Sequence, residues 1–341
     1  MALKKVVVTT TLNSLDGKEL RKMGAQLFHT PCRTEEEIIT ACQDAHVTVT
    51  HSIPVLIPFT RNVISKLKKC RLILDTGRGY EGIDVKAATD YGICVSNAGD
   101  YCSEEVSDHT MALLLACARK IPRLDRAIRQ GKWASSSKAE IMKLQLPTFK
   151  LKGQTLGIIG LGSIGRLVVP KGKGFGLRVI AFDPYLPFTV FDELGIESVT
   201  FDDLLTQSDF VSINAPSTTE THHLMGAKQF EKMKSTAYVI NTARGELIDE
   251  EALYTALSKN YIAGAGLDVI HGTSMQPTHP LLTLGNVIVT AHTAFYSESS
   301  VPEVTRRSYE QLGQIFQGEW PTWLVNSEVK KKFPGRWGKR D

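Results

Sequence analysis

Three glycines in the stretch "GIIGLGSIGRL" have the spacing of a phosphate-binding loop. Gly160, Gly162 and Gly165 follow an apolar run and precede a helical pattern. The first glycine permits a tight turn, the second lets the backbone approach a pyrophosphate, and the third allows close packing of helix on strand. A helix that starts near Ser163 and Ile164 would supply free N–H groups to the anion. The pattern therefore predicts a dinucleotide site.

An acidic residue follows this loop at the distance that such a site requires. Asp183 lies eighteen residues after Gly165, at the end of the next apolar run, "RVIAF". A carboxylate there can accept hydrogen bonds from both ribose hydroxyls and would repel a 2′-phosphate, so NAD is favoured over NADP. The alternative is a structural turn followed by an Asp that caps a helix.

Two further ionisable residues each follow a short β-branched run. Arg244 comes after "AYVIN" and His292 after "NVIVT". The planar guanidinium of Arg244 can hold a carboxylate and a carbonyl oxygen together, and the near-neutral pKa of an imidazole suits His292 to acid/base work. With a hydride donor, these groups could reduce a 2-oxo acid. The alternative for Arg244 is an ion pair with Asp249 or Glu250.

Short apolar runs alternate with amphipathic helical patterns along the whole chain, which predicts parallel sheets covered by helices. The length of 341 residues favours two domains, because single cores stop growing at roughly 250–300 residues. We expect a long helix over 103–130, either a linker or a dimer-forming element, and another over 300–320. The expected strands form two series, at 4–10, 45–51, 71–77 and 92–98, and at 155–160, 178–183, 210–216, 237–243, 263–269 and 286–292.

The composition, 42% hydrophobic and 22% charged with a net charge of +4, is that of an ordinary soluble globular protein. Six cysteines without a CxxC pair indicate reduced thiols in a cytoplasmic protein, neither a disulfide frame nor a zinc site. Every apolar run is far shorter than the about 20 residues that a membrane span needs. Dispersed basic residues argue against nucleic acid, and the adjacent pair His222–His223 argues against a metal site.

Several motifs occur in order: "GLGSIG…FDPY", "VSINAPSTTETHHLM", "VINTARGELIDEEAL", "GAGLDV" and "VTAHTAFYSESS". Together they resemble the NAD-dependent D-2-hydroxyacid dehydrogenase family. "DYCSEEVSDHTMALLLACARKI" makes the chain most similar to the branch related to the C-terminal-binding-protein corepressors. The resemblance implies two doubly wound α/β domains, a Rossmann NAD-binding domain (102–297) inserted into a flavodoxin-like substrate domain (1–101 and 298–341). It also implies chemistry in the cleft between the domains and a homodimer formed through the long helix.

The resemblance assigns roles to further residues. Arg244 grips the substrate's carboxylate and carbonyl, His292 is the acid/base, and Asp268 accepts a hydrogen bond from the nicotinamide carboxamide. Gly77 and Gly79 belong to a loop whose N–H groups bind the substrate carboxylate. Other implied residues are Ala215, Pro216, Thr221, Thr242 and Ala243 around the cofactor, and Tyr101 and Cys102 around the substrate.

The residue between the two glycines of this loop departs from the family pattern. Arg78 stands where family members usually carry a small apolar side chain. We hypothesise that it adds a second cation and favours a bulkier or doubly charged anion. The alternative is a side chain that points into solvent.

The largest departure concerns the partner of the catalytic His. In the family a Glu shortly after "LDV" hydrogen-bonds that His, but here Thr273 occupies the position, and no Asp or Glu occurs from Val269 to Ala291. A hydroxyl can orient an imidazole but supplies no charge to raise its pKa. Three alternatives follow: a dehydrogenase with weakened or acid-shifted activity, an altered reaction on the same scaffold, or an NAD-binding corepressor-like sensor with little or no catalysis.

Overall fold

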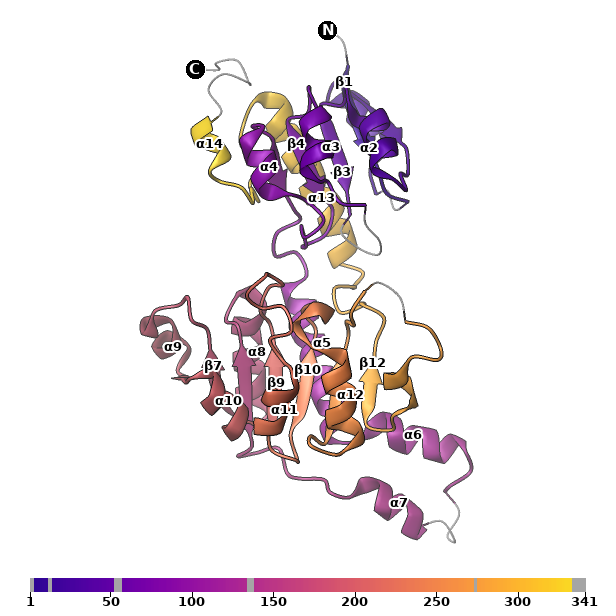
Figure 1. Cartoon of the computed structure of the whole chain (residues 1–341), viewed down its shortest axis with the longest axis vertical. Helices are drawn as coiled ribbons and strands as arrows, with labels where there is room; N and C mark the ends of the chain where they lie inside the picture. The colour runs from indigo at the N-terminus through magenta and orange to yellow at the C-terminus, as the bar shows by residue number, and fades with distance from the viewer. Residues whose placement is uncertain (1–2, 12–13, 52–56, 134–137, 273–274, 333–341) are drawn as a thin grey trace. The chain divides into compact units, whose positions relative to one another are not determined.

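The chain divides into two compact α/β units. A computed structural model describes residues 3–11, 14–51, 57–133, 138–272 and 275–332 (Figure 1). Unit 1 comprises Met1–Tyr101 and Ser297–Asp341, and unit 2 comprises Cys102–Tyr296. The second unit is thus an insertion in the sequence of the first.

Unit 1 is built on a five-stranded parallel sheet of order β2-β1-β3-β4-β5, the flavodoxin-like order. Its strands are β1 (Lys4–Val8), β2 (Ala25–His29), β3 (Val47–Thr50), β4 (Leu72–Asp75) and β5 (Cys94–Ser96). Its helices are α1 (Gly17–Lys22), α2 (Glu35–Cys42), α3 (Arg61–Lys66), α4 (Val85–Asp90), α13 (Ser300–Gln317) and α14 (Val329–Lys332).

Successive side chains along the strands of unit 1 point to opposite faces of the sheet and form two hydrophobic cores. Val6 and Val8 of β1 pack with Leu312 and Phe316 of α13, whereas Val7 packs on the opposite face with residues of α2, α3 and α4. Both sheet faces are therefore buried, as is usual for parallel sheets.

Unit 2 is built on a seven-stranded parallel sheet of order β12-β11-β10-β9-β6-β7-β8, a Rossmann order with one added edge strand. Its strands are β6 (Thr155–Ile159), β7 (Arg178–Phe182), β8 (Glu197–Ser198), β9 (Phe210–Ile213), β10 (Tyr238–Asn241), β11 (Gly264–Leu267) and β12 (Val287–Val289). Its helices are α5 (Ser103–Ala118), α6 (Ile121–Arg129), α7 (Lys138–Gln145), α8 (Ser163–Gly174), α9 (Phe188–Leu194), α10 (Phe201–Gln207), α11 (Ala227–Lys232) and α12 (Glu250–Ser258).

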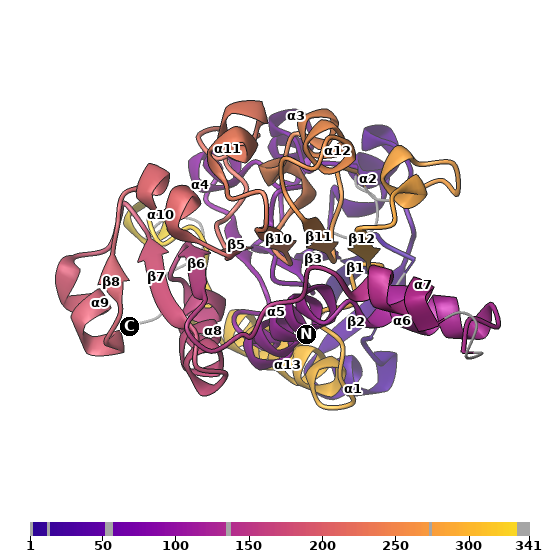
Figure 2. The same cartoon turned by 90° about the horizontal axis from the view of Figure 1, so that it is seen from below.

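The helices of unit 2 cover both faces of its sheet. Figure 2 shows α10, α11 and α12 on one face and α5 and α8 on the other. Leu204, Phe230 and Leu253 pack on the first face, and Met111 and Val168 on the second. The predicted class of two parallel-sheet α/β domains is confirmed.

The predicted long helix over 103–130 is wrong in one respect, because the structure breaks it into α5 and α6. Lys120 takes a left-handed conformation with φ of 54°, and Pro122 lies in the first turn of α6. A helix cannot continue through that conformation, and proline is tolerated in a first turn. Among the described residues, no helix combines the length and apolarity that a bilayer crossing demands.

Candidate active site

The glycine loop lies between β6 and α8, as the sequence predicted. Gly160 has φ of 88°, and a Cβ there would lie 3.0 Å from the main-chain N of Ala215. A Cβ on Gly165 would collide with the carbonyl oxygen of Gly160, whereas a Cβ on Gly162 would meet nothing within 4 Å. Two glycines are required by packing, and the third borders open space at the start of α8. This cradle fits a pyrophosphate.

The Asp183 carboxylate is fixed beside the glycine loop. Its Oδ2 accepts a hydrogen bond from Leu161 N at 2.9 Å, and its Oδ1 accepts one from Tyr185 N at 3.1 Å. The next helix, α9, has Pro187 at its N-cap, so Asp183 does not cap a helix. Each oxygen keeps a lone pair for a ribose hydroxyl.

The loop after β9 forms the opposite wall of the cradle. Thr221 Oγ1 donates to Pro216 O at 2.7 Å and accepts from Thr218 N at 2.8 Å, so this side chain closes its own loop. Asn214 Oδ1 is buried and meets no hydrogen-bond donor among the described residues. A buried acceptor of this kind indicates a place for a ligand donor or water.

Arg244 follows β10 and is positioned by a buried amide. Asn241 Oδ1 accepts from Ala243 N at 3.0 Å, and its Nδ2 donates to Arg244 O at 2.8 Å. The side chain of Arg244 donates through Nη1 to Ala243 O at 2.7 Å. Sequence reasoning missed Asn241, although an Asn at the end of a strand is a frequent turn residue.

The two acids considered as partners of Arg244 contact other groups. Asp249 caps α12 by accepting from Ala252 N at 3.1 Å. Glu250 Oε1 accepts from His271 N at 2.6 Å, and its Oε2 lies 3.4 Å from His279 Nε2. Within the described residues, both acids are thus held by groups other than Arg244.

Asp268 follows β11 and organises the turn that carries His292. Its carboxylate, 1% exposed, accepts from the Thr290 hydroxyl, from Thr293 N at 3.0 Å and from Ala294 N at 3.0 Å. Its carbonyl accepts from His292 N at 2.8 Å. His292 has φ of 53°, and its own N–H and those of the next two residues all donate to Asp268.

Helix α5 contributes two side chains to the same edge of the sheet. His109 Nε2 lies 2.9 Å from Thr290 Oγ1 and 3.6 Å from Asp268 Oδ1. The hydroxyls of Thr110 and Thr242 lie 2.7 Å apart, so Thr242 faces the helix through its side chain. Sequence reasoning missed His109, whose only signal was its place in the motif "SEEVSDHT".

The glycine-rich loop of unit 1 follows β4. Gly77 N donates to Asp75 Oδ1 at 2.7 Å, and a Cβ on Gly77 would lie 3.1 Å from both that oxygen and His51 Cε1. The N–H of Gly77 is therefore used within the loop and is not the one offered to an anion. Gly79 is also buried, and within the described ranges its N–H has no acceptor.

Arg78 lies between these glycines and is half-buried. Its carbonyl accepts from Asn97 Nδ2 at 2.6 Å. The pKa of the Asp100 carboxyl is held below its usual value, chiefly by a hydrogen bond from Arg307 and to a smaller extent by the charge of Arg78. The Arg78 guanidinium therefore lies near enough to Asp100 for the two charges to interact.

Of three other predicted positions, the structure describes Tyr101 and Cys102. Tyr101 is half-buried at the end of the first segment of unit 1, whereas Cys102 is 2% exposed and is the N-cap residue of α5. Thr273 lies outside the described residues. In the described part of the chain, no group of three or more His, Cys, Asp or Glu side chains could hold a metal ion.

Comparison with known proteins identifies the family that the chain resembles. Residues 111–294 match the family described as D-isomer specific 2-hydroxyacid dehydrogenase, NAD binding domain. A glyoxylate reductase of Korarchaeum cryptofilum is 40% identical over 81% of this chain and 82% of its own length. A D-3-phosphoglycerate dehydrogenase of Methanocaldococcus jannaschii is 38% identical over 94% of this chain, which spans 59% of that longer protein. The crystal structure of a glyoxylate reductase from Paecilomyes thermophila has a TM-score of 0.83 at 29% identity, covering 95% of this chain and 99% of its own.

Proposed function

The chain belongs to the D-isomer-specific 2-hydroxyacid dehydrogenase family, and on that premise we propose which residues perform an NAD-dependent reduction of a small 2-oxo acid. Family membership supports an oxidoreductase that uses NAD. The observation that carries the residue assignment is the sheet order, because Arg244, Asp268 and His292 follow the adjacent parallel strands β10, β11 and β12. Their groups therefore belong to one edge of one sheet, where ligands of open α/β sheets bind.

Arg244 binds the carboxylate and carbonyl oxygens of the substrate, and Asn241 holds the main chain of Arg244 for this purpose. NADH, when bound in the glycine cradle, supplies the hydride to the carbonyl carbon. His292 donates a proton to the carbonyl oxygen, which becomes the 2-hydroxyl. The resemblance to the family implies the N–H of Gly79 as a further donor for the substrate carboxylate. In the reverse direction His292 accepts the hydroxyl proton.

The identity of the substrate is proposed from the names of the relatives. The glyoxylate reductase and the phosphoglycerate dehydrogenase act on 2-oxo or 2-hydroxy acids that differ in charge, as their names show. Glyoxylate is the first candidate for this chain. Arg78 favours substrates with a second anionic group, and its half-buried position agrees better with this role than with a fully solvated side chain.

Thr273 makes the expected activity atypical. The segment from Val269 to Ala291 supplies no carboxylate, so an acid for the imidazole of His292 has to come from elsewhere in the chain. A hydroxyl at residue 273 contributes no charge, and proton donation at neutral pH is expected to be weaker than with a Glu there.

Oxidation of NADH is measured with glyoxylate, pyruvate, hydroxypyruvate and bulkier 2-oxo acids at pH 5 and pH 7.5. A dehydrogenase of the proposed kind turns over at least one of them, faster at the lower pH. Thermal stabilisation by NAD without turnover of any acid would instead identify an NAD-binding protein like the C-terminal-binding-protein corepressors. Turnover of other carbonyl compounds alone would point to an altered reaction.

A homodimer is part of the proposed function. A groove of about 890 Å³ is bordered by α6, the segment after α7 and the amino ends of β10 and β12. No residue of α7 is buried, while Trp133 is 80% exposed and Leu146 is 67% exposed. Apolar surface of this kind fits a second copy of the chain.

All six cysteines are free thiols, which supports the proposed cytoplasmic location.

A further inference from the structure

We propose that Asn97 is a positioning residue for the substrate carboxylate, an inference that rests on the proposed function. Its amide holds the carbonyl of Arg78 at 2.6 Å. In a planar trans peptide the carbonyl of one residue and the N–H of the next point in opposite directions. By holding the Arg78 carbonyl, Asn97 fixes the N–H of Gly79 on the opposite side, where it can meet the anion.

Asn97 is itself held through its side-chain oxygen and its main-chain carbonyl. Its Oδ1 accepts from Gly99 N at 2.9 Å, and its main-chain O accepts from Gln311 Nε2 at 2.9 Å. The neighbouring Ala98 N donates to Gly77 O at 2.8 Å. Two hydrogen bonds thus join the segment 97–99 to the glycine loop 77–79, one on each side of Arg78.

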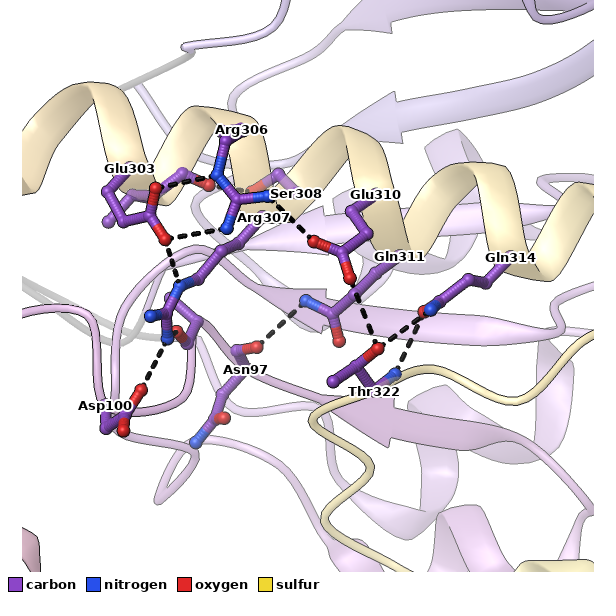
Figure 3. A network of polar contacts seen from close by, with 12 residues as sticks. Asn97, Asp100, Glu303, Arg306, Arg307, Ser308, Glu310, Gln311, Gln314 and Thr322 are labelled. Carbon is purple, nitrogen blue, oxygen red and sulfur yellow. Dashed lines mark hydrogen bonds and ion pairs between the residues drawn. The ribbon is translucent and has the colours of Figure 1, made fainter.

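Helix α13 supplies the rigid support for this segment. Figure 3 shows Gln311 and Arg307 pointing from α13 toward Asn97 and Asp100. Arg307 Nη1 donates to Asp100 Oδ1 at 2.7 Å, and its Nε donates to Glu303 Oε1 at 2.7 Å. Gln311 is fully buried, so its bond to Asn97 is shielded from water.

An aromatic side chain fixes the remaining residue of the segment. Arg307 lies over the Trp323 ring, 4.5 Å from its centroid. Gly99, with φ of 67°, contacts the same indole so closely that a Cβ would collide with it. The segment 97–99 is therefore held by α13, by Trp323 and by the glycine loop, and little freedom remains for the peptide that it positions.

The direct test is Asn97→Asp. The aspartate keeps an acceptor for Gly99 N but replaces the donor to the Arg78 carbonyl with an oxygen that repels it. A misdirected hydrogen bond to a charged ligand costs about tenfold or more in affinity. We expect KM for glyoxylate to rise about tenfold or more, KM for NADH to change less than twofold, and the dissociation constant of oxamate from the NADH complex to rise in parallel.

Two glutamines on α13 provide a matched pair. Gln311→Ala removes the bond to Asn97 O, whereas Gln314→Ala removes bonds of 2.8 and 2.9 Å to Thr322 in the same network. We expect Gln311→Ala to raise KM for glyoxylate severalfold, and Gln314→Ala to leave it unchanged. This pair of variants tests the role of Asn97 even when Asn97→Asp lowers the yield of folded protein.

Equal KM values for glyoxylate and equal oxamate binding in wild type, Asn97→Asp and Gln311→Ala would overturn the role of Asn97. That result leaves the proposed function standing if the wild type turns over glyoxylate. A wild type that neither reduces glyoxylate nor binds oxamate with NADH would overturn both.

Discussion

Asp268 binds the main chain on both sides of His292. Its carbonyl accepts from His292 N at 2.8 Å, and its carboxylate accepts from the N–H groups of the next two residues, at 3.0 Å each. One buried carboxylate thus sets the conformation of the turn that presents the imidazole. Because Asp268 follows β11 and the turn follows the neighbouring strand β12, both lie at the carboxyl edge of the same sheet.

Replacement of Asp268 by Asn is expected to lower kcat/KM for glyoxylate about 100-fold. The amide brings an N–H₂ group against a backbone N–H, and loss of a hydrogen bond to a charged group costs about 1.5–3 kcal/mol. Thr290→Val, which removes only the hydroxyl donor, should cost much less. A variant Asp268→Asn with unchanged kcat/KM and a lowered Tm would show that the carboxylate is only structural.

Asp183→Ser should shift the cofactor preference toward NADPH. Loss of the carboxylate removes hydrogen bonds to the ribose and the repulsion of a 2′-phosphate. The ratio of kcat/KM for NADH to that for NADPH is expected to fall about 100-fold, which corresponds to about 2.7 kcal/mol. Glu220→Gln is the control, because Glu220 bonds to the Tyr185 hydroxyl and not to the loop. An unchanged ratio in Asp183→Ser would contradict the role of this acid.

Thr273→Glu should raise kcat for glyoxylate at pH 7.5 and move the pH optimum upward. In the proposed role of residue 273 as the partner of His292, a carboxylate favours the protonated imidazole and thereby extends proton donation to higher pH. Thr273→Gln has the same length without the charge and should leave the pH profile unchanged. If both variants behaved alike in steady-state assays across pH 5 to 9, charge at residue 273 would not control the reaction.

The lowered pKa of Glu303 predicts that the folded protein loses stability in acid. Hydrogen bonds from Arg306 and then Arg307 lower the pKa of this carboxyl to about 2. Because the folded pKa lies below the unfolded value of 4.5, the contribution to stability is complete above that value and is lost as the pH falls toward 2. In urea unfolding, Glu303→Gln should be less stable than the wild type at pH 7, and the difference should shrink at pH 3. A constant difference would exclude this linkage.

The groove next to α6 and α7 predicts the oligomeric state. Light scattering after size exclusion should give the mass of a dimer, about twice 37.6 kDa, for the wild type. Trp133→Glu together with Leu146→Glu places charges on the exposed apolar surface and should shift the protein toward monomer. Phe28→Glu, a substitution in unit 1 at a residue 38% exposed, is the control. A dimer unaffected by the double substitution would place the interface elsewhere.

Local sequence correctly placed the glycine loop between β6 and α8 and Asp183 after β7, because these residues lie on consecutive elements with fixed spacing. It was insufficient where donors and acceptors come from separate parts of the chain. The carboxylate of Asp268 binds residues 22 to 26 positions later, and Asn97 binds Arg78 across 19 positions. No local period encodes such pairs. The break at Lys120 was also missed, because the apolar pattern runs on through a residue with a left-handed backbone.

The left-handed backbone of His292 lowers the stability of the fold at the position that carries the proposed acid/base group. A side chain held at φ of 53° carries a conformational cost that glycine escapes, of about 1–3 kcal/mol. The fold with His292 is therefore slightly less stable than the fold with glycine at this position would be. The imidazole at this position is therefore explained by the proposed proton transfer and not by the stability of the turn.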